Sequence, residues 1–216
     1  MKISRFLPIV LFLSWAPPAY SELVIGSDEL PESIKVIDFS NIGGIFHSTG
    51  PHDIGADAQE SVIWTSMPRG SLYDRHGTAG FGHNNPGWSR ATGRESFSVS
   101  AIDPGGTVFM NYYFEDGPVA IAGGFMNYST GPYNGNFGSV EVLIQALGVN
   151  GEILESYNLL DEAPITTPGH FRGISRSQND ISSLRVQSDG RFFGLDELTF
   201  VRGPIFLGGF EGQLEE

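Results

Sequence analysis

The sequence predicts an all-β protein, built as an antiparallel β-sandwich. The pattern favours a jelly roll, although the number of strands alone does not distinguish a jelly roll from an immunoglobulin-like sandwich. Outside residues 1–21, no stretch of a dozen residues has apolar side chains at the i, i+3, i+4, i+7 spacing of an amphipathic helix. Short runs with an apolar residue at every second position recur along the chain instead. Turn sequences such as Asn150-Gly151 and Asp189-Gly190 separate these runs. Asn-Gly and Asp-Gly pairs tolerate the positive φ of tight hairpin turns, so the runs are expected to be strands.

Several of the expected strands show clear alternation of apolar and polar residues, and turn residues separate the strands. In the run 181–187, Leu184 and Val186 share one face and Arg185 lies on the other, because side chains on a strand alternate between faces. In the run 139–147, Ile144 and Gln145 likewise lie on opposite faces of the expected strand. In chain order the expected strands are 34–40, 61–66, 96–102, 108–114, 119–128, 139–147, 153–159, 171–175, 181–187 and 192–201.

Two long stretches are not strand-like. Residues 42–60 and 67–94 are rich in Gly, His, Asp and Asn, and loops of this length in a compact domain are usually functional or disordered. We expect one sandwich domain over residues 22–202, with an acidic, Gly-rich flexible tail at 203–216.

Residues 1–21 have the pattern of a secretory signal peptide. Basic residues precede an apolar run at 6–15, which is shorter than the roughly 20 residues needed to span a bilayer. Ala19 and Ser21 are small residues at the positions that signal peptidase requires for a cut between Ser21 and Glu22. We therefore expect a secreted, extracellular or periplasmic protein, with no membrane insertion after cleavage of the signal.

The composition limits the partners. The chain of 216 residues has 25 acidic and 12 basic residues, and its formal net charge is −13. Nucleic acid is therefore not expected as a partner, whereas cations and neutral sugars are electrostatically easier to bind. The chain has no cysteine, which excludes disulfides and thiol chemistry.

The last expected strand carries a carboxylate in an apolar setting. Asp196 has the same parity as Leu198 and Phe200, which are natural core residues. A carboxylate directed at a core is costly unless a cation or hydrogen-bond donors meet it. The pattern leaves two alternatives open: Asp196 binds a structural ion, or a bulge turns it out to solvent.

Several segments resemble a known group of proteins. Residues 117–128, 151–159, 163–169, 171–175 and 195–200 resemble bacterial exported β-sandwich proteins of the PEP-CTERM-associated type. That group is loosely similar to the galactose-binding-like jelly rolls of carbohydrate-binding modules. The sequence has no terminal Pro-Glu-Pro segment, so we expect free secretion or periplasmic residence rather than sorting through a PEP-CTERM tail.

The resemblance implies a structural calcium ion. Such jelly rolls often hold calcium near the start of the first strand and within the last strand, and Asp196 matches the second position. Asp38 or Glu32 is the candidate N-terminal counterpart. Calcium takes six to eight oxygen ligands from carboxylates and carbonyls, and the acidic composition suits it. The alternative is that these acids are solvated at strand ends.

Aromatic and amide residues in two polar stretches are candidates for carbohydrate binding. The faces of sugar rings stack on aromatic side chains, while amides and guanidinium groups bind the hydroxyls. Exposed aromatics in a polar loop are unusual without a use, although they also cap sandwich cores. The candidate residues are Trp88, Arg90, Tyr128, Tyr133, Asn134 and Asn136.

Evidence for metal-dependent or hydrolytic chemistry is weaker. His47, His52, His76 and His83 lie in the two long stretches, but their spacings match no zinc template. The Gly-x-Ser-x-Gly elbow of serine hydrolases is absent. Asp196 and Glu197 are adjacent, so on a regular strand they point to opposite faces and cannot form the carboxylate pair of a glycosidase.

The sequence therefore favours a secreted, non-catalytic, carbohydrate-binding β-sandwich with a candidate structural calcium and a glycan or cell-surface polysaccharide as its partner. Two other functions stay open. One is a secreted polysaccharide hydrolase with its acids in residues 42–94. The other is a structural surface or matrix protein without a small ligand.

Overall fold

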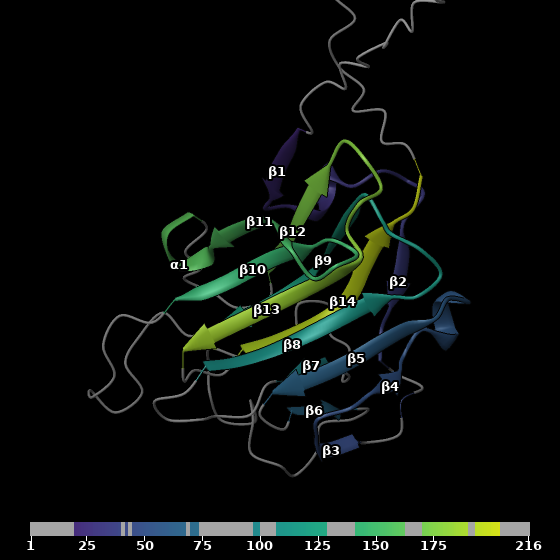
Figure 1. The fold of residues 1–216 in the computed structure, drawn as a ribbon, viewed down its shortest axis with the longest axis vertical. Helices are drawn as coiled ribbons and strands as arrows, with labels where there is room; N and C mark the ends of the chain where they lie inside the picture. The colour runs from purple at the N-terminus through teal and green to yellow at the C-terminus, as the bar shows by residue number, and fades with distance from the viewer. Residues whose placement is uncertain are drawn as a thin grey trace, which may run out of the picture.

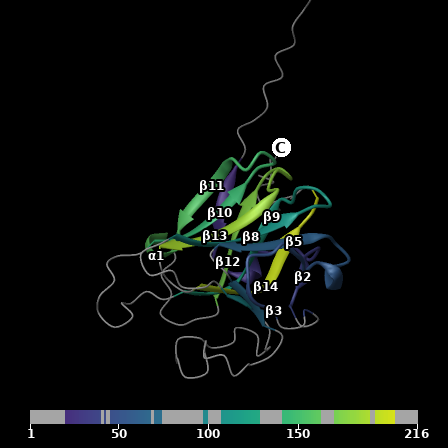
Figure 2. The ribbon, with the colours of Figure 1, turned by 60° about the horizontal axis from the view of Figure 1, so that its bottom comes forward.

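The computed structural model describes residues 20–39, 42, 45–67, 70–73, 97–99, 107–128, 141–162, 170–189 and 193–203. These residues form two antiparallel sheets that stack as a sandwich, as Figures 1 and 2 show. In the described part of the chain, the one α-helix is the single turn α1 (Leu159–Glu162). Two 3-10 turns accompany it, η1 (Ser27–Glu29) and η2 (Ala56–Ala58). The prediction of an all-β, jelly-roll-like sandwich is confirmed.

The sheet farther from the viewer in Figure 1, called the back sheet, has eight strands. Its order is β1 (Ser21–Val24), β12 (His170–Arg176), β9 (Ile121–Tyr128), β14 (Phe193–Val201), β7 (Phe97–Val99), β6 (Gly70–Tyr73) and β3 (Ile45–Ser48). The short strand β2 (Lys35–Ile37) pairs with the second half of β14, beside the segment of β14 that pairs with β7.

The sheet nearer the viewer, called the front sheet, has six strands. Its order is β11 (Ile153–Asn158), β10 (Val142–Leu147), β13 (Ser183–Asp189), β8 (Thr107–Phe114), β5 (Val62–Met67) and β4 (His52–Asp53). The core lies between the two sheets. Its largest fully buried side chains include Trp64, Tyr112 and Met110 from the front sheet and Phe193, Phe200 and Met126 from the back sheet.

Every strand expected from alternation is present, with ends shifted by a few residues. The expectation of loops at 42–60 and 67–94 is wrong in part, because β3, β4 and β6 form there. These strands are short and lack an alternating pattern of their own. Each is ordered by its neighbour, since β4 pairs with β5, β6 with β7 and β3 with β6.

A bulge changes the phase of β14. Asp196 pairs with Phe125 of β9, but the next pair joins Thr199 to Gly123, so two residues of β14 stand opposite one of β9. Glu197 in the bulge has a φ of +49°. The core residues of β14 are accordingly Phe193 and Leu195 before the bulge and Leu198 and Phe200 after it.

The prediction that Asp196 shares a face of the sheet with Leu198 and Phe200 is therefore wrong, because the bulge lies between them. Since neighbouring side chains on a strand alternate, Asp196 lies on the opposite face from the core residue Leu195. It is nevertheless only 5% exposed, so the bulge does not carry it into solvent.

Candidate functional site

The outward face of the front sheet carries a row of polar side chains that crosses the strands. Strand pairing aligns Thr65 of β5 with Asn111 of β8 and Asn111 with Arg185 of β13. Arg185 in turn pairs with Gln145 of β10, and Gln145 with Ser156 of β11. These five aligned residues are called the polar row here. The strands that carry them lie side by side in Figure 1.

Hydrogen bonds link the members of the polar row. Arg185 donates from Nε to Oδ1 of Asn111 at 2.7 Å, and Asn111 donates from Nδ2 to Oγ1 of Thr65 at 3.2 Å. Farther along, Gln145 donates from Nε2 to Oγ of Ser156 at 3.2 Å. Asn111 is 2% exposed and Gln145 is 5% exposed, so both amides are held tightly among their neighbours.

Arg185 is fixed on a second side by an aromatic ring. Its guanidinium carbon lies 5.0 Å from the ring centroid of Phe109, a cation–π contact. Within the part of the chain that the structure describes, the terminal Nη groups of Arg185 have no acceptor. Two contacts therefore orient the guanidinium while its outer end keeps its donors available.

Rows with apolar residues flank the polar row on both sides. On one side, Met67 pairs with Phe109 and Leu143 lies in the same line; on the other, Ile63 pairs with Tyr113. Met67 is 58% exposed, and the other four are partly buried. The result is a sheet face on which hydrogen-bonded polar groups lie between apolar and aromatic side chains.

Most of the carbohydrate-binding candidates from the sequence lie outside the described residues. Trp88 and Arg90 fall within 74–96, and Tyr133, Asn134 and Asn136 fall within 129–140. The second segment joins the end of β9 to β10, so it connects the back sheet to the front sheet. Their role stays a prediction.

Tyr128, the remaining candidate, is described. It ends β9, is 6% exposed and packs in the core. Its hydroxyl accepts a hydrogen bond from Nε of Arg172 at 3.2 Å. Burial raises the pKa of Tyr128, and this hydrogen bond acts in the opposite direction. So deep a ring presents little surface to a sugar.

Strand pairing places Asp38, one of the calcium candidates, next to the bulge of β14 that follows Asp196. β2 ends at Ile37, which pairs with Leu198 of β14, so Asp38 follows directly beside the bulge that contains Glu197. Asp38 is partly buried, whereas Glu32 is exposed and precedes β2. Among the described residues, no group of three or more His, Asp or Glu side chains is arranged to hold a metal ion.

The histidine candidates do not form a described metal site either. His52 has its Nε2 atom 2.7 Å from Oγ of Ser48, and its ring stacks on Trp64 with a centroid distance of 5.9 Å. The side chains of His47, His76 and His83 lie outside the described residues.

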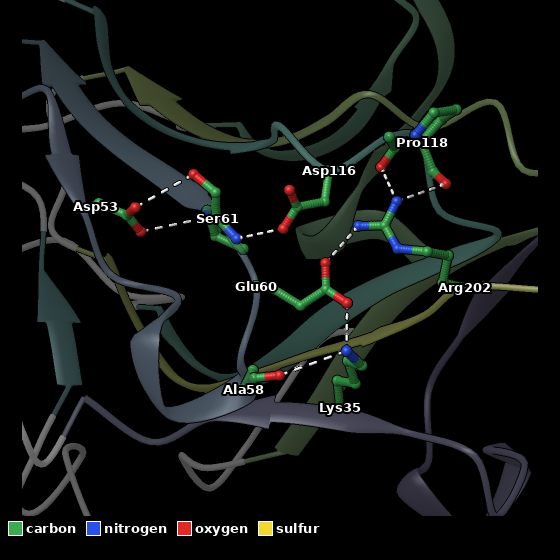
Figure 3. A network of polar contacts seen from close by, with 10 residues as sticks. Lys35, Asp53, Ala58, Glu60, Ser61, Asp116, Pro118 and Arg202 are labelled. Carbon is green, nitrogen blue, oxygen red and sulfur yellow. Dashed lines mark hydrogen bonds and ion pairs between the residues drawn. The ribbon is translucent and has the colours of Figure 1, made fainter.

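In the stretch 42–60, the carboxylate of Glu60 connects segments that are distant in the sequence. Figure 3 shows Glu60 between Lys35 and Arg202, and it forms an ion pair with each. Arg202 also donates to the carbonyls of Gly117 and Pro118. These contacts tie β2 and the end of β14 to the turn between β8 and β9.

Ser61 forms a second centre of the same network. Its backbone N–H donates to Asp116 at 2.6 Å, and its hydroxyl donates to Asp53 at 3.2 Å, as Figure 3 shows. The other carboxylate oxygen of Asp53 accepts the N–H groups of Gly55 and Val62. These carboxylates are structural hydrogen-bond acceptors at this end of β5.

No protein-family model matches the chain, and no curated protein matches it. Among solved structures, the arabinose-bound MgGH51 α-L-arabinofuranosidase is similar with a TM-score of 0.39 and 11% identity, over 78% of this chain and 26% of that one. The enzymatically active domain of tailspike protein 4 from bacteriophage CBA120 is similar with a TM-score of 0.31 and 13% identity, over 76% of this chain and 20% of that one. This chain thus spans about a quarter or less of either protein, and both likenesses are too distant to bear on function.

None of the helices described is long and apolar enough to cross a membrane.

Proposed function

We propose that this protein is an exported, non-catalytic β-sandwich that binds carbohydrate on the outward face of its front sheet. The observation that carries the proposal is the polar row, with Asn111 and Arg185 hydrogen-bonded at its centre and apolar residues on both sides. Export rests on the signal-peptide pattern at residues 1–21. Membership of the PEP-CTERM-associated type rests on the sequence resemblance alone.

The chemistry of the face suits a sugar. A pyranose ring has C–H groups on its faces and hydroxyls at its rim, so it needs apolar contact beside hydrogen-bonding groups. Tyr113 and Met67 offer apolar contact, and the Nη groups of Arg185 are donors for hydroxyl oxygens. Because the polar groups stand on paired strands, little side-chain freedom is lost when a ligand binds.

The loop residues predicted from the sequence would form a second set of contacts. Trp88, Arg90, Tyr133, Asn134 and Asn136 have the residue types that bind sugars. Strand-mounted and loop-mounted residues would then act as separate subsites, which variants can distinguish.

A bound calcium ion is the second part of the proposal. Asp38 and Asp196 lie on neighbouring segments beside the bulge in β14, and a buried carboxylate such as Asp196 favours a nearby cation. With only two carboxylates, the ion would take most of its ligands from backbone carbonyls and water. When bound, calcium would link β2 to β14.

A glycan array together with a reducing-sugar release assay tests the carbohydrate function. We expect binding without release of reducing ends, and binding at least tenfold weaker for Arg185→Gln. Gln187 pairs with Phe109 and lies on the same face as Arg185, whereas Gln178 is exposed and lies outside that face. Gln187→Ala and Gln178→Ala make the same change at the two positions, so we expect only Gln187→Ala to weaken binding. Release of reducing ends, no binding to any glycan, or full binding by Arg185→Gln would overturn the proposal.

A further inference from the structure

We infer that the ligand of the front sheet carries a carboxylate, and that Arg185 is its receptor. The ligand class is an acidic saccharide of the uronate type. This inference rests on the proposed function, because it specifies which carbohydrate the face selects.

The first support is the geometry of the guanidinium. Nε of Arg185 is occupied by Oδ1 of Asn111 at 2.7 Å, and the ring of Phe109 lies 5.0 Å from the guanidinium carbon. These contacts leave the two Nη groups at the outer end, where they form a parallel pair of donors. A carboxylate has two oxygens at the matching separation and accepts both bonds in parallel, whereas a single hydroxyl oxygen cannot face two separated, parallel donors.

The second support is charge. The chain has 25 acidic residues against 12 basic residues, so carboxylates outnumber cations by about two to one. Lys35, Arg176 and Arg202 each form an ion pair with a carboxylate. Arg185 forms none within the described residues, although it is partly buried in the middle of a sheet. A ligand carboxylate would supply the missing counter-charge.

The third support is the neighbour of Arg185 across the strands. Gln145 pairs with Arg185 in register, and opposed residues on one face have Cβ atoms about 4.5–5.5 Å apart. The Oε1 atom of Gln145 is buried and has no donor among the residues described. In a uronate the carboxylate stands next to a ring hydroxyl, so one sugar residue offers an acceptor to Arg185 and a donor to Gln145. Rotation of the covered amide is required for the second contact.

The formal net charge of −13 repels long anionic polymers and weakens their binding, so a short ligand suits the test. At 0.15 M salt the Debye length is about 8 Å, so a short ligand responds mainly to groups on the binding face. Galacturonic acid trisaccharide is therefore the probe, and the same trisaccharide with methyl-esterified carboxylates is its neutral match.

Isothermal titration calorimetry at pH 7 and 0.15 M salt measures both ligands on the full chain. We expect the acid to bind at least tenfold more tightly than the ester. Arg185→Gln should lose at least tenfold for the acid and remove the preference, and Arg185→Lys should lose part of the affinity because the paired donors are gone. Arg202→Gln removes the same charge elsewhere, so we expect affinity within twofold of the parent protein. Circular dichroism verifies that each variant is folded.

Each result separates this inference from the proposed function. Equal affinity for acid and ester, with both weakened by Arg185→Gln, would overturn the inference and leave carbohydrate binding in place. Equal losses in Arg185→Gln and Arg202→Gln would show a general charge effect and also overturn it. Absence of binding to every glycan on the array would overturn the proposed function itself.

Discussion

Arg185 of β13 and Asn111 of β8 are joined across paired strands by a hydrogen bond of 2.7 Å from Nε to Oδ1. Asn111 passes the connection on to Thr65 through its other amide atom. Asn111 thus orients the guanidinium and would itself have a limited contact with a ligand, since it is almost fully buried.

Replacing Asn111 by Ala should therefore weaken ligand binding and destabilise the fold. The substitution leaves Nε of Arg185 and the hydroxyl of Thr65 without this partner, and losing such buried hydrogen bonds costs about 1–3 kcal/mol. Urea denaturation measures the free energy of unfolding. Asn179→Ala, at an exposed position, is the control, and an equal effect of the two substitutions would contradict the role of Asn111.

Glu60 is the centre of the ion-pair network, and its substitution should reduce stability. Its side chain is 8% exposed, while those of Lys35 and Arg202 are 39% and 26% exposed. Because both partners reach solvent, we expect Glu60→Gln to cost about 1–2 kcal/mol, less than a fully buried pair would. A double-mutant cycle with Arg202→Gln should show coupling. Additive effects of the two substitutions would mean that the pair contributes nothing.

The bulge in β14 makes Glu197 a site where glycine is favourable. A φ of +49° is strained for a residue with a Cβ atom. Glu197→Gly should raise the free energy of unfolding by up to about 1 kcal/mol, and Glu197→Val should lower it, because β-branched residues tolerate positive φ least. Thermal unfolding of the two variants checks the order. A Val variant as stable as the Gly variant would exclude backbone strain at this position.

The pairing of Gly123 with Gly173 allows β9 and β12 to approach closely beneath Phe171. A Cβ atom on Gly123 would lie 2.5 Å from the carbonyl oxygen of Arg172 and 2.9 Å from the Phe171 ring. Gly123→Ala should therefore destabilise the protein by about 2 kcal/mol or more, through overpacking against backbone. At Gly151 nothing lies within 4 Å, but its φ of +78° strains any residue with a Cβ atom. Gly151→Ala should therefore cost about 1 kcal/mol, less than Gly123→Ala in the same denaturation experiment.

Tyr128 gives the protein a sensitivity to alkaline pH. Burial raises its pKa above 10.0, the ordinary value that it regains on unfolding. Above that pH the folded state holds a proton that the unfolded state has lost, so stability is complete below about pH 10 and falls as the pH rises further. Tyr128→Phe should reduce this fall in denaturation curves measured from pH 8 to 11. An unchanged slope would assign the effect to other groups.

Thermal unfolding with calcium and with a chelator tests the proposed ion. We expect calcium to raise the melting temperature and Asp196→Asn to abolish the rise, because ligand that binds the folded state alone stabilises it. Glu32→Gln, at the alternative N-terminal candidate that is exposed and precedes β2, is the control. An equal melting temperature in calcium and chelator would refute the site.

Alternation along single strands predicted a large part of this architecture. It placed Leu184 and Val186 in the core and Arg185 and Gln145 away from it, and the structure has all four so. It did not predict that Arg185, Gln145 and Asn111 stand in one row. That alignment depends on the register between strands that are distant in the chain, which turn geometry and packing fix together.

The bulge marks another limit of single-strand patterns. Parity placed Asp196 with Leu198, but one inserted residue reverses the faces of everything that follows. The alternation of Phe193 and Leu195, followed by Leu198 and Phe200, does carry the signal, because two odd positions are succeeded by two even ones.

The anchoring of Arg202 has a mechanical consequence. A pulling force applied to the chain beyond residue 203 would reach the sandwich through Arg202. Its side chain forms an ion pair with Glu60 and donates a hydrogen bond to the Gly117 carbonyl. Behind it stands β14, bordered by β9 on one edge and by β2 and β7 on the other. Detaching that strand means shearing hydrogen bonds along both edges at once, so a tether at this end would be attached to an interior strand of the back sheet.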